Sequence, residues 1–163
     1  MKVREFLDLI FGSEEKGYLC LASIDRSNNK RFIQEFFLLP FGLDEAVEWV
    51  NERMSLDLYF CPLLFSKPSR KKDLALGSNR LWADLDNCDP KYLGEFGEPR
   101  PNVVVKTSPG RWQAYWFLNK IYDTKILENY NKRLCRAYKD RGIDQGGWDL
   151  TQLLRLPTKN YKY

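Results

Sequence analysis

Hydrophobic positions along the first half of the chain follow two different periods. Apolar residues that recur every three to four positions are typical of amphipathic helices, and short apolar or alternating runs are typical of strands. The pattern predicts helices at Val3–Phe11 and Asp44–Met54, strands at Gly17–Ile24 and Phe32–Leu38, and a buried strand with its exit at Leu56–Phe65. The polar, basic stretch from Lys67 to Ser78 is predicted to be a loop.

The second half is organised around a tight turn at Pro109-Gly110. This turn separates two runs with strand character, which predicts an antiparallel hairpin. The three predicted strands are Leu81–Asp86, Asn102–Ser108 and Arg111–Leu118. A long helix is predicted at Thr124–Arg141, because Leu127, Tyr130, Leu134 and Tyr138 share one face, with Asp123 or Thr124 capping its start and Gly142 its end. These elements predict an α+β domain with a mostly antiparallel sheet.

Length and composition narrow the possible functions. The 163 residues contain no linker-like tract and no fixed repeat, so we expect one compact domain spanning 1–163. Histidine is absent, which excludes serine-histidine triads, cysteine-histidine proteases and histidine-ligated zinc hydrolases. The four cysteines form no CxxC pair, which makes a zinc site improbable, and two of them lie in apolar runs, as buried thiols do in a reducing compartment.

A first candidate site is the acidic motif Asp84-Leu85-Asp86. In a strand both aspartates point to the same side, with Cα atoms roughly 6.6 Å apart. Two carboxylates at this spacing can hold a divalent cation. The alternative is a solvent-facing strand end that leads into the Asp89-Pro90 turn.

A second candidate site lies at the predicted hairpin turn. Ser108 and the backbone around Gly110 can present donors to an anion, since glycine allows a close approach. Gln113 is a polar amide in an aromatic-rich strand, so it is either satisfied by neighbouring groups or binds a ligand. The aromatic residues of this strand, Trp112, Tyr115 and Trp116, are better explained as core than as a base-stacking surface.

A third candidate segment follows the long helix, where Asp149 precedes an apolar run interrupted by Arg155. A buried arginine needs an anionic partner, which could be Asp149, another carboxylate or a bound phosphate. The 26 basic and 22 acidic residues give a net charge of +4, which favours a polyanionic partner only mildly. A basic cluster precedes the acidic motif and offers either phosphate contacts or a solvated loop; its members are Lys67, Arg70, Lys71 and Lys72.

Taken together, the motifs resemble the catalytic core of the archaeo-eukaryotic primase superfamily, especially replication primases and primase-polymerases of phages and plasmids. The resemblance rests on the DxD strand, the S-P-G-x-x-Q-x-Y-W hairpin and the ending with Asp149 before R-L-P-x-x-N-x-K, and it covers about Leu81 to Tyr163. It implies a primase-polymerase fold with two modules, an N-terminal α/β module over about 1–78 and a C-terminal module similar to an RNA-recognition fold over about 79–163. The active site is expected between these modules.

The resemblance also implies residue roles. Asp84, Asp86 and Asp149 would be the catalytic ligands of two Mg2+ or Mn2+ ions. The incoming triphosphate would contact Ser108, Gly110, Gln113, Arg155 and Lys162, although many family members carry histidine in place of Gln113. The template would contact Lys67, Arg70, Lys71 and Lys72.

The implied function is template-directed nucleotidyl transfer from nucleoside or deoxynucleoside triphosphates on single-stranded DNA. A replicative helicase is an expected further partner and a membrane is not. With no signal peptide and no apolar run long enough to span a bilayer, the protein is expected in the cytoplasm of a prokaryote or a virus-infected cell. Two alternatives stay open, namely a non-catalytic module that binds single-stranded nucleic acid, and another metal-dependent nucleotide enzyme such as a nuclease or a DxD glycosyltransferase.

Overall fold

A computed structural model describes residues 1–161 and divides the chain into two compact units. Unit 1 comprises Met1–Leu76 together with Leu153–Tyr163, and unit 2 comprises Gly77–Gln152. The predicted α+β class with antiparallel sheets is confirmed, since the described residues contain three α-helices and two antiparallel sheets. The predicted division into an N-terminal module over about 1–78 and a C-terminal module over about 79–163 stays a prediction. None of the helices in residues 1–161 has the length and apolar composition needed to cross a bilayer.

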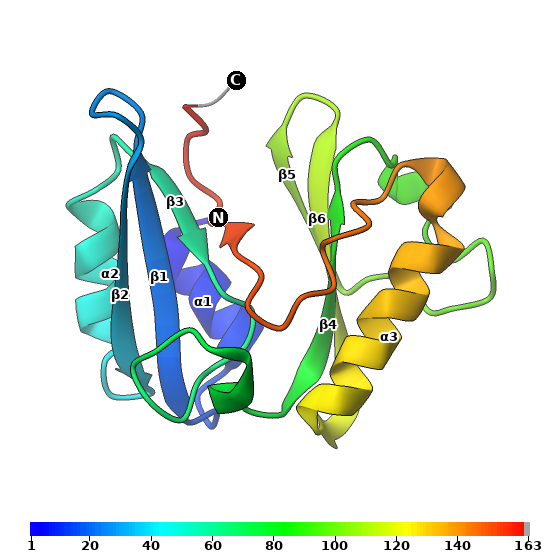
Figure 1. Ribbon diagram of the computed structural model, residues 1–163, viewed down its shortest axis with the longest axis horizontal. Helices are drawn as coiled ribbons and strands as arrows, with labels where there is room; N and C mark the ends of the chain where they lie inside the picture. The colour runs from blue at the N-terminus through cyan, green and yellow to red at the C-terminus, as the bar shows by residue number, and fades with distance from the viewer. Residues whose placement is uncertain (162–163) are drawn as a thin grey trace. The chain divides into compact units, whose positions relative to one another are not determined.

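Unit 1 is a four-stranded sheet with two helices (Figure 1). The strand order is β2-β1-β3-β7, with every neighbouring pair antiparallel. Its elements are α1 (Val3–Phe11), β1 (Gly17–Asp25), β2 (Arg31–Leu39), α2 (Leu43–Asn51), β3 (Asp57–Phe60) and β7 (Leu154–Arg155). The last of these strands comes from the end of the chain, so residues far apart in sequence complete one sheet.

The two helices of unit 1 cover one face of its sheet. The ring of Phe60 on β3 lies 5.2 Å from Phe6 and 6.2 Å from Phe11 of α1. On β2, Phe37 makes an edge-to-face contact with Trp49 of α2. Side chains alternate along a strand, so the opposite face carries the intervening residues, and Figure 1 views the sheet from that side.

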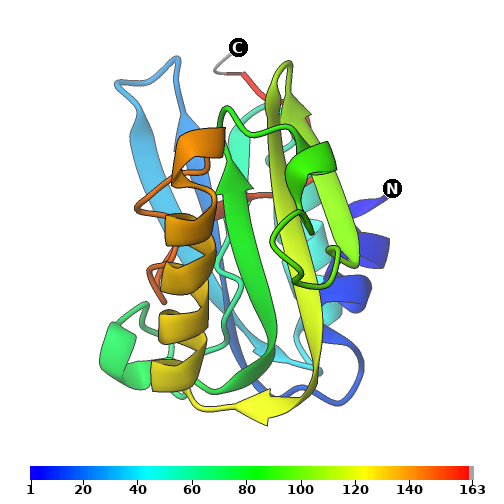
Figure 2. The ribbon, with the colours of Figure 1, turned by 90° about the vertical axis from the view of Figure 1, so that its right-hand side faces the viewer.

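Unit 2 is a three-stranded antiparallel sheet in the order β4-β6-β5, with a helix alongside β4 (Figures 1 and 2). Its elements are β4 (Ser78–Leu85), β5 (Val103–Ser108), β6 (Arg111–Tyr122) and α3 (Thr124–Ala137). The predicted hairpin is confirmed: β5 and β6 pair across the Pro109-Gly110 turn, in which Gly110 has a φ of 73°. A positive φ favours glycine at this position.

Helix α3 begins as expected but ends earlier and buries a different stripe. The Asp123 carboxylate accepts a hydrogen bond from the Ile126 N–H at 3.0 Å and caps the first turn. The helix ends at Ala137, and a short 3-10 turn carries the chain to Gly142. Leu127 and Tyr138 of the predicted face are fully buried, whereas Tyr130 and Leu134 are half-buried, because the fully buried stripe is shifted by one position to Asn131 and Cys135.

The buried Asn131 explains this shift. Its side-chain oxygen accepts a hydrogen bond from the backbone N–H of Trp82, on the edge of β4. A buried backbone donor must be paired, and β4 has a neighbouring strand on one side only. Asn131 supplies a partner on the other side, a role that a count of apolar positions cannot detect.

Candidate functional site

The acidic motif lies at the end of β4, on one face of the unit 2 sheet. Asp84 is directly opposite Gln113 of β6, and Val105 of β5 continues the same row. Asp86 follows the strand, and its carboxylate accepts a hydrogen bond from the Arg111 guanidinium at 2.7 Å. The predicted alternation therefore brings two aspartates and the anomalous glutamine to one face.

Gln113 is buried, and a tyrosine holds it in place. The Tyr115 hydroxyl donates to Gln113 Oε1 at 3.2 Å. Burial raises the pKa of Tyr115 well above its usual value, and the nearby charge of Asp84 raises it further. Tyr115 is therefore a proton-bearing donor at any physiological pH, and it holds Gln113 by the oxygen of its amide.

The hairpin turn beside this face offers groups for an anion. The Oγ atom of Ser108 is buried and has no hydrogen-bond partner within residues 1–161. A buried hydroxyl without a partner is costly, which makes it a candidate for ligand binding. A Cβ atom at Gly110 would have no heavy atom within 4 Å, so the backbone at this turn is accessible.

The segment before Asp149 runs along the free edge of β4. The Asp144 N–H donates to the Asp84 carbonyl at 2.9 Å, and the Trp82 indole N–H donates to the Gly147 carbonyl at 2.9 Å. A Cβ atom at Gly147 would lie 3.5 Å from the Cβ of Asp84. Gly147 is two residues before Asp149, so these contacts place the segment that leads to Asp149 against the acidic motif of β4.

The carboxylate of Asp149 is turned into its own loop. It accepts hydrogen bonds from the Thr151 N–H at 2.7 Å and from the Thr151 hydroxyl at 2.8 Å. Within residues 1–161, no three Asp, Glu, Cys or His side chains lie close enough together to hold a metal ion. The donors are oxygens of the type that Mg2+ and Mn2+ prefer. Cation binding would require Asp86 to leave Arg111 and Asp149 to leave Thr151.

The hydrogen-bond partners of Arg155 are not Asp149, the first candidate partner that the sequence offered, but Asp57 and Tyr59. It lies on β7 in unit 1, where Nη1 donates to Asp57 at 3.0 Å and Nη2 donates to the Tyr59 hydroxyl at 2.8 Å. Arg26 also forms an ion pair with Asp57, whose side chain has no exposed surface. Of the partners considered, another carboxylate is therefore the one present, and Asp57 was not among the candidate residues.

Asp57 is held as a carboxylate by its neighbours. Burial alone would raise its pKa, but hydrogen bonds from Arg155, from the Tyr161 N–H and from Arg26 lower it below the usual value. One sequence signal could have pointed to this residue: it is a lone charge at the start of the apolar run Leu56–Phe65. Arg111 was likewise overlooked, although it alternates with Gln113 and so shares its face.

The remaining predicted residues lie in the basic loop of unit 1 or outside the described part. Lys67, Lys71 and Lys72 are exposed. Arg70 is half-buried and donates from Nε to the Gln34 side-chain oxygen at 3.2 Å. Lys162 lies outside the described residues. None of the four cysteines forms a disulfide within residues 1–161, and all four are buried, as expected for the two in apolar runs, Cys20 and Cys61.

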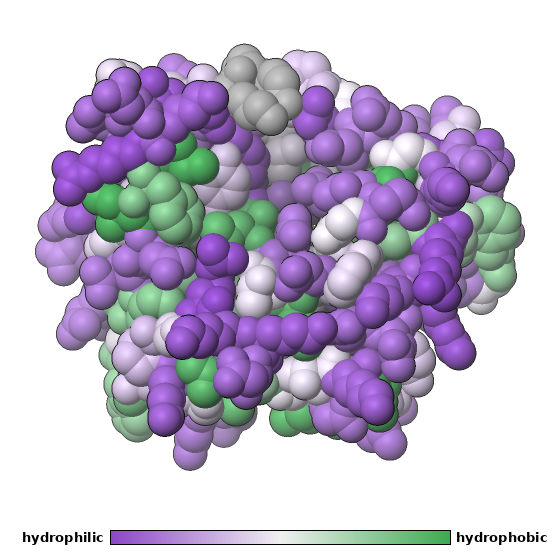
Figure 3. Space-filling model, viewed as in Figure 1, coloured by the Kyte–Doolittle hydropathy of each residue, from purple (hydrophilic) through white to green (hydrophobic). Residues whose placement is uncertain are grey.

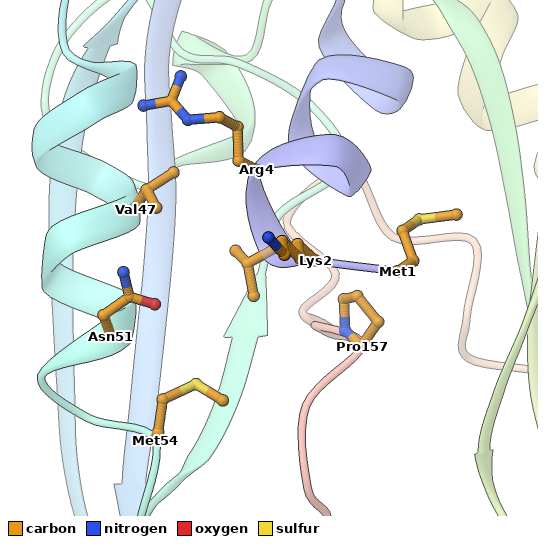
Figure 4. A pocket seen from close by; sticks show the side chains of 8 residues that line it. Met1, Lys2, Arg4, Val47, Asn51, Met54 and Pro157 are labelled. Atoms are coloured by element: carbon orange, nitrogen blue, oxygen red, sulfur yellow. The ribbon is translucent and has the colours of Figure 1, made fainter.

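A separate pocket lies in unit 1, apart from these groups. It has a volume of about 450 Å3 and is bordered by the start of α1, by α2 and by Pro157 (Figure 4). Figure 4 shows the side chains of Met1 and Met54 at this pocket. None of the predicted site residues lines it.

Comparison with solved structures identifies the fold. The crystal structure of primase RepB' matches with a TM-score of 0.70 and 16% identity, covering 98% of this chain and 50% of that one. The AEP domain of the cyanophage S-2L primase-polymerase matches with a TM-score of 0.70 and 14% identity, covering 96% of this chain and 81% of that one. The catalytic domain of RepB' in complex with initiator DNA matches with a TM-score of 0.67 and 13% identity, covering 99% of this chain and 80% of that one.

The chain therefore has the fold of archaeo-eukaryotic primases, and the resemblance seen in the motifs is confirmed at the level of the fold. It spans half the length of the RepB' chain that it matches. No family model matches the sequence. No curated protein matches it either.

Proposed function

We propose that this chain is the catalytic domain of a primase or primase-polymerase, which joins nucleoside triphosphates on a single-stranded DNA template. The observation that carries the proposal is the placement of the three motifs on a primase fold. Asp84, Asp86 and Gln113 share one sheet face, the Ser108 turn ends the neighbouring hairpin, and the Asp149 segment is hydrogen-bonded to the edge of β4. The fold neighbours that support it are primase and primase-polymerase domains.

In this proposal the aspartates of unit 2 hold Mg2+ or Mn2+. Asp84 and Asp86, at the end of β4, would hold the ion together with Asp149, which follows the segment that is hydrogen-bonded to the edge of β4. When bound, divalent cations lower the pKa of an attacking 3′-hydroxyl and stabilise negative charge on the pyrophosphate leaving group. Three carboxylates against two such ions would leave a net positive charge, which attracts a triphosphate.

Residues of the hairpin orient the triphosphate. The Ser108 hydroxyl and the backbone at Gly110 donate to phosphate oxygens, and Gln113, held by Tyr115, offers its amide nitrogen. Arg111 pairs with Asp86 in this structure, and its guanidinium would be available to the phosphates if a cation took its place at Asp86. Arg155 and Lys162 complete the proposed set, and Arg155 can contact phosphate only in competition with Asp57.

The template is proposed to contact the basic loop, through Lys67, Arg70, Lys71 and Lys72. These are contacts to phosphates, so DNA affinity should fall as salt increases. A replicative helicase is a further proposed partner of the protein during DNA synthesis.

The deciding experiment is incorporation of labelled nucleotides on single-stranded DNA, with and without a primer, in Mg2+ and in Mn2+. The Asp84→Asn, Asp86→Asn double variant should lose at least about 100-fold of the rate, since two of the three proposed ligands of the catalytic cations lose their negative charge. Asp140→Asn is the matched control, because this aspartate is exposed on the 3-10 turn after α3. Equal activity of the double variant and the control would reject the assignment.

One observation favours a second candidate, a module that binds single-stranded DNA without chemistry. Asp86 and Asp149 are both engaged by neighbours, and within the described part of the chain no three acidic side chains converge. This candidate predicts salt-sensitive DNA binding that is the same with and without divalent cation. Calorimetry separates the two candidates, because only the catalytic one requires Mn2+ binding that is lost in the double variant. Hydrolysis of DNA without incorporation would identify a nuclease instead.

A further inference from the structure

The sheet of unit 1 has one face that its two helices do not cover. On edge strand β2 this face carries four residues, which the register pairs with residues of β1. We call them the β2 stripe: Phe32, Gln34, Phe36 and Leu38. Neighbouring strands extend the same face to Tyr59 of β3 and Arg155 of β7.

Two apolar side chains of the β2 stripe are exposed to solvent. Phe32 is 46% exposed and Leu38 is 44% exposed. Figure 3 views this face and shows apolar patches over the region that Figure 1 labels β1 and β2. An exposed apolar group bordered by polar side chains often marks a binding surface.

Positive charges border the stripe on both sides. Arg70 is anchored to it by its hydrogen bond to Gln34, and the exposed lysines of the basic loop lie just before and just after Arg70 in the chain. At the other end, Lys30 and Arg31 are exposed where β2 begins. Figure 3 shows hydrophilic side chains around the apolar patches.

Few acidic groups lie near this face, and the exposed Asp73 is the acidic residue of the basic loop itself. Asp57 is paired with two arginines, and Asp25 accepts hydrogen bonds from Ser27. Glu35 belongs to the opposite face by alternation. A ligand at the stripe therefore meets aromatic rings and positive charge, which together suit unpaired nucleobases linked by phosphates.

We propose that the β2 stripe is a stacking surface for single-stranded DNA, with bases on Phe32 and Phe36 and phosphates at Arg70 and the adjacent lysines. This inference rests on the proposed function and names the surface that holds its template. Duplex DNA is a poor ligand for such a surface, because its bases are already stacked on each other. The charge around the stripe favours DNA over a second copy of this chain, which has a net charge of +4.

The test measures the affinity of the intact protein for a fluorescein-labelled oligothymidylate by anisotropy, without nucleotide and with EDTA. Phe32→Ala and Phe36→Ala should each weaken binding at least about fivefold, since aromatic stacking contributes of the order of one factor of ten per base. Phe32→Leu should also weaken it, because leucine keeps apolar area but has no ring face. Phe41→Ala is the matched control, since Phe41 is 84% exposed and lies outside the stripe.

Salt dependence separates the two kinds of contact. Phe32→Ala should leave the slope of log affinity against log salt unchanged, whereas Arg70→Gln should lower it by about 0.7, the value for one phosphate contact on a single strand. Melting temperatures of all variants show whether a loss of affinity reflects unfolding. Stripe variants that fold normally and bind within twofold of the unmodified protein would overturn the inference.

Two further outcomes are informative. If sedimentation shows a dimer that Phe32→Ala dissociates while DNA affinity stays the same, the stripe is an interface between copies and the inference fails. Because the assay contains no divalent cation and no nucleotide, its result is independent of catalysis. Equal incorporation by the Asp84→Asn, Asp86→Asn variant and its control would overturn the proposed function alone, whereas unchanged DNA affinity of the stripe variants would overturn the stripe inference alone.

Discussion

The two units each contain an aspartate–arginine pair near a predicted motif, and the pairs differ in burial. In unit 1, Asp57 is fully buried between Arg26 and Arg155. In unit 2, the side chains of Asp86 and Arg111 are 43% and 30% exposed. A buried pair cannot lose one partner without leaving a charge in a medium of low polarity, whereas an exposed pair is readily replaced by water or an ion. The buried Asp57 pairs therefore stabilise the fold, whereas the exposed Asp86–Arg111 pair can separate and each side chain can bind another partner.

The largest effect is expected from breaking the buried pair. Asp57→Asn leaves two arginines without their carboxylate, and the free energy of unfolding should fall by about 3 to 5 kcal/mol. Denaturation by urea measures this. The Asp140→Asn variant should change the same quantity by less than about 0.5 kcal/mol. A loss below 1 kcal/mol for Asp57→Asn would mean that solvent reaches the cluster.

The same variant has a defined pH dependence. Because the pKa of Asp57 is lowered in the folded protein, its contribution is fully present above the usual carboxyl pKa of about 4 and is lost as pH falls through the lowered value. The stability difference between the unmodified protein and Asp57→Asn should be constant from pH 5 to 8 and should narrow below about pH 4. A difference that narrows instead as pH rises above 6 would contradict this sign.

A smaller effect is expected from breaking the exposed pair. Arg111→Ala should change the free energy of unfolding by less than about 1 kcal/mol, because exposed ion pairs contribute little. The same change should raise the affinity for Mn2+ up to about fivefold, since Asp86 no longer has a competing partner. Calorimetry in the absence of nucleotide measures this. An unchanged Mn2+ affinity would separate Asp86 from the proposed cation site.

The smallest expected effect is on the rate at which one buried thiol in each unit reacts with a thiol reagent. Burial raises the pKa of Cys20 in unit 1 to about 12 and is the main cause that raises the pKa of Cys135 in unit 2 to about 11. At pH 8 both should react with a thiol reagent far more slowly than in the denatured chain. In Asp57→Asn, we expect Cys20 to become reactive before Cys135. Equal acceleration at both sites, read by mass spectrometry, would show that the two units open together.

The sequence predicted most elements because their periodicity is local. The strand period alone predicts that Asp84 and Asp86 point to one side, and the Pro109-Gly110 turn alone predicts the hairpin that the pairing of β5 with β6 confirms. That Asp84 lies opposite Gln113 is known only from the pairing of β4 with β6. The partner of Arg155 could not be predicted in this way. Asp57 is 98 residues away in the chain, and only the pairing of β7 with β3 brings the two together. The fold comparison supports the primase resemblance, while the residue roles stay predictions.

The position of β7 has a consequence for how the chain is made. Unit 2 is encoded between β3 and β7, so the sheet of unit 1 lacks its last strand until all of unit 2 and then β7 have left the ribosome. Until then, Asp57 has neither Arg155 nor the Tyr161 N–H as a partner. Unit 2 is continuous in sequence, so the contacts within it can form before β7 is made. We therefore expect unit 2 to become protease-resistant first during synthesis, and unit 1 only after β7 has paired with β3.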